Sequence, residues 1–99
     1  MTIEKKLEGK KMTLVLEGRL DTTTAPKLQE VLIPAISEAE ELNLDFSSLA
    51  YVSSAGLRVL LMGQKTAKAK AVNLTVSNVS DEIMEVLEMT GFSEMLTIV

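Results

Sequence analysis

The sequence predicts an α/β protein: a single two-layer domain over residues 1–99, with a mixed β-sheet and helices mainly on one face. Short segments alternate apolar and polar residues, which is typical of half-buried strands, and longer segments carry apolar residues at helical spacing. These segments follow one another in the order β-β-α-β-α-β-α-β, so the β-α-β stretches imply parallel strands with right-handed crossovers. The clean alternation of the inner strands indicates that the second sheet face is more polar.

The composition fits this architecture. A chain of 99 residues is close to the usual size of one domain, and its 46% hydrophobic and 24% charged residues are typical of a globular protein. Aromatic residues make up only 3% of the chain. The core is therefore expected to be aliphatic, with methionines filling part of it.

The first two predicted strands form a β-hairpin. Ile3–Leu7 and Met12–Leu16 both alternate, and Gly9-Lys10-Lys11 supplies the turn between them. Gly18 is expected to end the second strand.

The first predicted helix follows the segment Asp21–Thr24, which consists of residue types that favour helix N-caps. Pro26 suits a first helical turn, and apolar residues at helical spacing continue from Leu28 to Ala39. Pro34 lies inside this run and is expected to kink the helix, because proline removes one backbone hydrogen bond.

The central elements are a strand, a helix and a second strand. Leu42–Phe46 alternates as a strand does, and Ser47–Val52 is expected to be a loop. A helix is predicted from about Ser54, with an inner face that extends to Ala67. Val72–Val76 is the next alternating strand.

The last helix is predicted to begin at Ser80, a capping residue type followed by two acidic residues in the first turn. Gly91 is expected to follow its C-terminus, and Leu96–Ile98 to form a short final strand. The predicted buried stripe of this helix consists of Ile83, Val86, Leu87 and Thr90.

Several classes of function are excluded by composition. The chain has no His and no Cys, which removes histidine bases, thiol nucleophiles and zinc-thiolate sites. No glycine-rich phosphate loop or catalytic constellation is visible, so we expect a binding protein rather than an enzyme, without cofactor or metal. The net charge of −4 argues against direct nucleic-acid binding.

The sequence also bears on location. No apolar run approaches about 18 residues, so no membrane span is predicted. The charged, alternating segment Met1–Lys11 does not have the pattern of a signal peptide, and a cytoplasmic location is expected.

All five charged residues of the segment 71–99 are acidic. A solvated face is the simpler interpretation of this segment, and a surface that binds a basic partner is the alternative.

The most informative segment runs from Asp45 to Arg58, where a strand ends and a helix opens on Ser53-Ser54-Ala55-Gly56-Leu57. In the simpler interpretation, Ser53 or Ser54 caps the helix and Gly56 permits close packing. The functional interpretation is that a serine here is a covalent switch, because the helix dipole favours a phosphate at this end. The two interpretations are compatible.

Four motifs of the sequence resemble those of the STAS domains, specifically the bacterial anti-sigma factor antagonists (anti-anti-sigma factors). The resemblance covers nearly the whole chain. The motifs are Gly18-Arg19-Leu20-Asp21, Leu44-Asp45-Phe46-Ser47-Ser48-Leu49, Ser54-Ala55-Gly56-Leu57 and Met89-Thr90-Gly91-Phe92.

The resemblance implies a partner-switching protein. In that family the antagonist binds an anti-sigma factor with a GHKL-type ATPase domain, which releases a sigma factor. The anti-sigma factor then acts as a serine kinase on the antagonist, and a phosphoserine phosphatase reverses the modification. Matched by position, the acceptor is Ser54, and Asp21 corresponds to a family aspartate near it. The family usually has aspartate just before the acceptor, whereas this chain has Ser53, which is an alternative acceptor.

The expected partner-binding surface combines the Asp21 region, the loop before the second helix and the start of that helix. Gly56 has no side chain to block a partner, and Arg58 could reach a partner carboxylate. A different class of function stays open, namely a constitutive STAS scaffold subunit of a lipid-transport or sensory complex. A monomer is expected. The predicted binding residues are Asp21, Tyr51, Val52, Ser53, Ser54, Gly56, Leu57 and Arg58.

Overall fold

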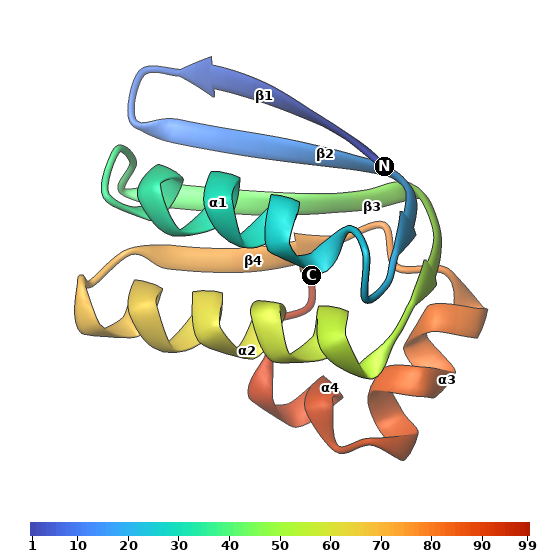
Figure 1. Ribbon diagram of the computed structural model, residues 1–99. Coiled ribbons are helices and arrows are strands. Elements are labelled where there is room, and N and C mark those ends of the chain that lie inside the picture. The colour runs from blue at the N-terminus through green and yellow to red at the C-terminus, as the bar shows by residue number, and fades with distance from the viewer.

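A computed structural model describes residues 1–99 as a four-stranded mixed sheet with four helices. The elements are β1 (Thr2–Glu8), β2 (Lys11–Leu20), α1 (Ala25–Ile36), β3 (Glu41–Val52), α2 (Ser54–Ala69), β4 (Asn73–Ser77), α3 (Asp81–Met89) and α4 (Phe92–Met95). The strand order is β1-β2-β3-β4; β1 is antiparallel to β2, and the other neighbours are parallel. Figure 1 shows α1 and α2 lying side by side along the sheet, with α3 and α4 gathered near one end of it. The predicted fold class and element order are confirmed.

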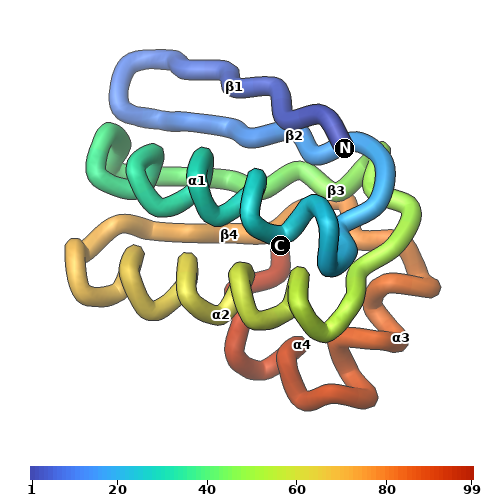
Figure 2. The backbone as a smooth tube through the Cα atoms, viewed as in Figure 1, coloured from blue at the N-terminus to red at the C-terminus, as the bar shows by residue number.

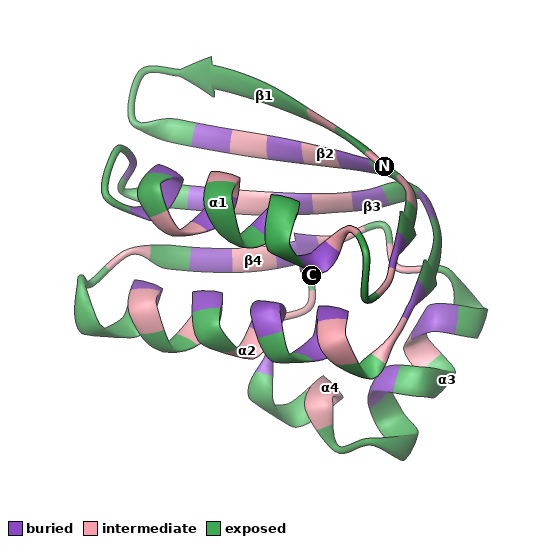
Figure 3. Cartoon of the chain, in the orientation of Figure 1, coloured by how far each residue is buried: buried purple, intermediate pink, exposed green.

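One apolar core of 24 buried residues lies between the sheet and the helices. The predicted alternation is present in β2, where Met12, Leu14 and Leu16 are buried while the residues between them stay partly exposed. Figure 3 shows this banding along the strands. The other sheet face is polar: Asn43 donates to Thr75 Oγ1 at 2.9 Å and accepts from the Ser77 hydroxyl at 2.9 Å.

Two strands are longer than the sequence predicted. β2 continues through Gly18 to Leu20, although its pairing with β1 ends at Glu17. The segment Ser47–Val52, predicted as a loop, is the second half of β3. The two extensions pair with each other, and two register shifts interrupt the regular alternation on which strand prediction depends.

The helices also differ from the predictions in detail. α1 contains Pro34 but ends at Ile36 rather than at Ala39. In α3 only Ile83 and Leu87 are buried; the predicted stripe residues Val86 and Thr90 are exposed. Because α3 lies near the end of the sheet, as the tube in Figure 2 also shows, only a narrow stripe of it reaches the core.

The end of the chain is less regular than predicted. The expected strand Leu96–Ile98 is a single parallel bridge between Ile98 and Val76, and the short helix α4 was not predicted. Two predicted signals are confirmed nearby: the Ser80 hydroxyl caps α3, and Gly91 adopts a left-handed backbone with φ 79°. None of the helices combines the length and the apolar character that crossing a bilayer requires.

Candidate functional site

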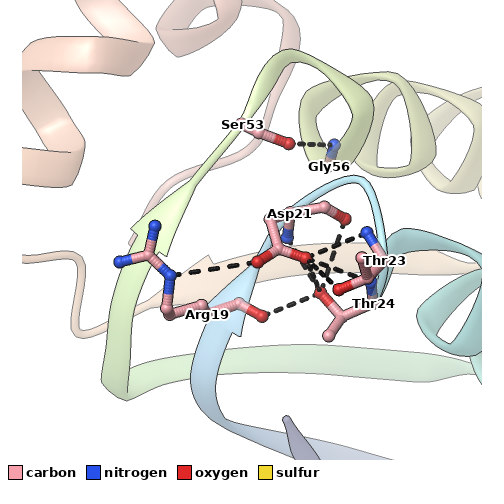
Figure 4. Close-up of polar contacts among 6 residues, drawn as sticks. All are labelled: Arg19, Asp21, Thr23, Thr24, Ser53 and Gly56. Carbon is pink, nitrogen blue, oxygen red and sulfur yellow. Dashed lines mark hydrogen bonds and ion pairs between the residues drawn. The ribbon is translucent and has the colours of Figure 1, made fainter.

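The candidate site lies where the β2–α1 and β3–α2 connections meet. Because β2 and β3 are parallel neighbours, their carboxyl ends lie at the same edge of the sheet, and Leu20 pairs with Val52 there. The backbone amide of Ser53 donates to the Leu20 carbonyl oxygen at 2.8 Å, which joins the two connections directly. Figure 4 shows Asp21 with its contacts to Arg19, Thr23 and Thr24 on one connection, and the Ser53 contact with Gly56 on the other.

The two adjacent serines have different roles in the start of α2. Ser53 is the N-cap residue, with an extended backbone, and its hydroxyl oxygen accepts from the Gly56 amide at 3.3 Å. Ser54 is the first residue of the helix and is exposed, and its hydroxyl makes no hydrogen bond within the chain. The structure therefore assigns the capping role to Ser53 and leaves Ser54 accessible.

Asp21 organises the connection between β2 and α1. One of its carboxylate oxygens accepts from the Thr23 hydroxyl at 2.7 Å, from the Thr23 amide at 3.0 Å and from the Thr24 amide at 3.2 Å. The Thr23 hydroxyl contributes most to a lowered pKa of Asp21; desolvation, the second largest effect, opposes it, and the two amides lower the pKa further. Asp21 is therefore an anionic group at this edge of the sheet at neutral pH.

Arg19 and Tyr51 form a contact that the sequence did not predict. The guanidinium carbon of Arg19 lies 4.2 Å from the centroid of the Tyr51 ring, and the Arg19 Nε atom lies 3.8 Å from the Asp21 carboxylate. Arg19 pairs with Tyr51 across β2 and β3, so the contact follows from the irregular register of the two strands. The sequence places Arg19 in the Gly18-Arg19-Leu20-Asp21 motif and predicts Asp21 and Tyr51 as binding residues, but nothing in it links Arg19 to Tyr51.

The predicted binding residues divide into exposed and buried groups. Tyr51, Ser54 and Arg58 are exposed, and Asp21 and Ser53 are partly exposed. The remaining three are buried and support this surface from beneath: Val52, Gly56 and Leu57.

Gly56 in particular faces the interior. A Cβ atom at this position would lie 2.6 Å from Leu20 Cγ and 3.1 Å from the Leu20 carbonyl oxygen. The space left by its missing side chain is thus filled by Leu20 of the same chain. Both interpretations of Gly56 needed a small residue here, and the structure shows that close packing between α2 and β2 requires it.

Comparison with known proteins identifies the family. The sequence matches the family model described as "Mlab, STAS domain" over residues 3–97, and the chain therefore belongs to the STAS domain family. The family expected from the motifs is confirmed.

The sequence is also similar to curated bacterial proteins. It is 29% identical over 86 residues to the anti-sigma-B factor antagonist of Listeria monocytogenes, a match that covers 86% of this chain and 75% of that protein. It is 26% identical over 83 residues to the anti-sigma-B factor antagonist of Bacillus subtilis, covering 84% of this chain and 76% of the relative.

Solved structures show the same fold. The anti-sigma factor antagonist SpoIIAA in its unphosphorylated form aligns with a TM-score of 0.77 at 16% identity, covering 99% of this chain and 87% of that one. An anti-sigma factor antagonist from Mycobacterium paratuberculosis aligns with a TM-score of 0.88 at 18% identity, covering 98% and 83%. A sulfate transporter family protein from Wolinella succinogenes also aligns, with a TM-score of 0.80 at 22% identity, covering 93% and 75%. The fold is therefore shared by anti-sigma factor antagonists and by a protein of the sulfate transporter family.

Proposed function

We propose that this protein is an anti-sigma factor antagonist that binds an anti-sigma factor and is switched by phosphorylation of Ser54. The observation that carries the proposal is the accessible Ser54 hydroxyl at the first position of α2, without a hydrogen bond inside the chain. Ser53 holds the cap, so Ser54 can be modified without removing the hydrogen bond that starts the helix. The relatives named anti-sigma-B factor antagonists support the same function.

The phosphoryl transfer requires only the Ser54 hydroxyl from this chain, because the kinase supplies the ATP and the base. The Ser54 oxygen attacks the γ-phosphorus of an ATP held by the kinase, the bond to the β-phosphate oxygen breaks, and ADP leaves. The hydroxyl proton passes to a base of the kinase. The product places about −1.5 to −2 charges at a helix N-terminus, where free amides and the helix dipole stabilise an anion.

The proposed binding surface is centred on Ser54 and includes Asp21, Tyr51 and Arg58 as accessible charged or aromatic groups. Buried Val52, Gly56 and Leu57 contribute by fixing the backbone beneath it. The partner is an anti-sigma factor with serine kinase activity, and a phosphoserine phosphatase restores the unmodified form. The antagonist is then a binding protein and a kinase substrate rather than an enzyme, and we place the exchange in the cytoplasm, where sigma factors act.

The test is a phosphorylation assay with the anti-sigma kinase encoded in the same genome and Mg-ATP. We expect one phosphate per chain, with Ser54→Ala abolishing incorporation and Ser53→Ala largely retaining it. Phosphate mapped to Ser53 would overturn the site assignment. Stable binding of the kinase without modification of either serine would overturn the switch.

A second candidate is a constitutive scaffold subunit of a lipid-transport or sensory complex. The observation that favours it is Ser53, which stands where the family usually has an aspartate beside the acceptor. A pull-down with and without ATP separates the two candidates. An ATP-sensitive complex with an anti-sigma factor supports the switch, whereas an ATP-insensitive complex with membrane-transport subunits supports the scaffold.

A further inference from the structure

The cations of α2 have no partner within the chain. All five ion pairs join residues of the segment 4–41. Helix α2 carries Arg58, Lys65 and Lys68 and no acidic residue, and none of these three cations takes part in an ion pair. The helix therefore presents uncompensated positive charge to solvent.

These charges lie on the same helix as Ser54. The residues Ser54, Arg58, Met62 and Lys65 are all exposed and follow the spacing of one helix face; we call this set the α2 stripe. Side chains four residues apart on a helix are neighbours, with Cβ atoms about 5–6 Å apart. Arg58 is therefore the cation of α2 closest to the Ser54 hydroxyl along this face.

The surface beside the stripe is suited to contact with a protein. Met62 is 40% exposed. It lines an open groove of about 570 Å³ between α1 and α2, together with Pro26, Ile33 and Pro34 and with polar residues that include Glu30. A partner that follows the stripe from Ser54 would meet positive charge first and then this partly apolar groove. An acidic partner segment complements the cations of the α2 stripe, Arg58 and Lys65.

We propose that Arg58 couples the phosphorylation state of Ser54 to partner binding by exchanging one anion for another. This inference rests on the proposed function. With Ser54 unmodified, the Arg58 guanidinium binds a carboxylate of an acidic partner segment that lies along the α2 stripe. With Ser54 phosphorylated, the same guanidinium pairs with the phosphate within the chain and is lost to the partner.

The chemistry favours this exchange. A phosphate offers three acceptor oxygens, and arginine donates to phosphate in a bidentate, charge-assisted geometry. An anion that precedes a cation by four residues is the favourable orientation on a helix. Phosphorylation would then weaken binding in two ways, because it adds negative charge that repels the acidic partner and removes the cation that attracted it.

The first experiment measures the contact within the chain and needs no kinase. Phosphoserine is inserted at position 54 during translation, and its second pKa, ordinarily about 6, is followed by phosphorus NMR. Arg58→Gln is expected to raise this pKa by about 0.5 unit, roughly a threefold change in proton affinity, because a nearby cation favours the dianion. Lys65→Gln removes the same charge about three turns from Ser54 and is expected to leave the pKa unchanged. Equal pKa values in all three proteins would overturn the contact.

The second experiment measures the contact with a partner anion, using a hexaglutamate peptide as the probe. In the unmodified protein the peptide is expected to shift the Arg58 side-chain Nε–H resonance, and in the phosphoserine protein this response is expected to be lost. If the peptide does not shift the Arg58 Nε–H resonance of the unmodified protein, the proposed exchange is overturned. Neither readout depends on a kinase, so failure here is distinct from a failure of Ser54 to be phosphorylated by an anti-sigma factor.

Discussion

Gly56 of α2 lies directly against Leu20 of β2, and a Cβ atom on Gly56 would come within 2.6 Å of Leu20 Cγ. The same atom would lie 3.1 Å from the Leu20 carbonyl oxygen, which accepts the hydrogen bond from the Ser53 amide. The close approach therefore holds the start of α2 against the end of β2. The position of Ser54 relative to Asp21 depends on this packing.

We expect Gly56→Ala to destabilise the fold by about 1–3 kcal/mol, because inserting a methyl group into a packed interior forces neighbouring atoms to move. The contact includes a backbone oxygen, which cannot rotate away. Gly63→Ala is the matched control, since its Cβ would meet mainly the end of the Leu32 side chain at 2.6 Å. Urea unfolding should show the larger loss for Gly56→Ala, and an equal or smaller loss would contradict the proposed packing role.

The two serines are expected to respond differently to replacement by alanine. Ser53→Ala removes the side-chain acceptor for the Gly56 amide and should lower the free energy of unfolding by about 1 kcal/mol. Ser54→Ala removes an exposed hydroxyl without a partner and should change it by less than about 0.5 kcal/mol. Thermal unfolding of both variants checks this order, and a larger loss for Ser54→Ala would show that Ser54 has a structural role.

The fold was predictable from sequence because its signals are local. Alternation in β2 and the capping pattern of Ser80 each depend on a few neighbouring residues, and both are confirmed. The second half of β3 was not predictable, because its strand conformation depends on pairing with the end of β2 through shifted registers. Val86 was misjudged because helical spacing cannot reveal how little of α3 reaches the core.

The candidate site was predictable to a similar extent. The serine segment at the start of α2 was evident from residue types, but spacing could not decide which serine caps the helix. That distinction depends on the backbone conformation of Ser53, which is extended while Ser54 is helical. The contact of Arg19 with Tyr51 joins two strands that are separated along the chain, so only the three-dimensional structure shows it.

Asp21 is expected to stabilise the fold at neutral pH and to lose this effect in acid. Its pKa is lowered in the folded state, chiefly by the hydrogen bond from the Thr23 hydroxyl. A lowered carboxyl pKa gives stability that is present above the unfolded-state pKa, about 3.9, and is lost as the pH falls through the folded-state value. Asp21→Asn should therefore melt at a lower temperature than the wild type at pH 7, with the difference shrinking below about pH 4.

Thr23→Ala is the control for this prediction, because it keeps the carboxylate and removes the main cause of its lowered pKa. Its melting temperature should depend on pH less steeply than that of the wild type between about pH 4 and the lowered pKa. A difference between wild type and Asp21→Asn that stays constant down to pH 2 would show that charge on Asp21 contributes nothing.

Ser53→Asp is expected to speed phosphorylation of Ser54 by a family-type kinase. Aspartate is as good an N-cap as serine, so the hydrogen bond from the Gly56 amide should be kept. The added carboxylate could orient the acceptor hydroxyl or the metal of the nucleotide. Initial rates with Mg-ATP check the expectation, with Ser53→Asn as the uncharged control. An unchanged or lower rate would show that this chain does not need the carboxylate.

Ser54→Asp is expected to separate binding from folding. The substitution places a negative charge on the first residue of α2, where the helix dipole should stabilise it by about 0.3–1 kcal/mol. In the proposed complex the same charge faces the partner and pairs with the Arg58 guanidinium, so the loss should fall on the complex. Aspartate carries less charge than phosphate, and the loss of affinity should therefore be smaller than that caused by phosphorylation.

Thermal melts and titrations with the anti-sigma factor should be run side by side, with Ser54→Asn as the uncharged control of similar size. We expect the Ser54→Asp variant to melt at or slightly above the temperature of the wild type while binding more weakly, and Ser54→Asn to keep most of the affinity. A large drop in melting temperature would mean that the first turn of α2 does not tolerate the charge. Loss of binding would then follow from damage to the fold, and the Ser54 switch would lose its physical basis.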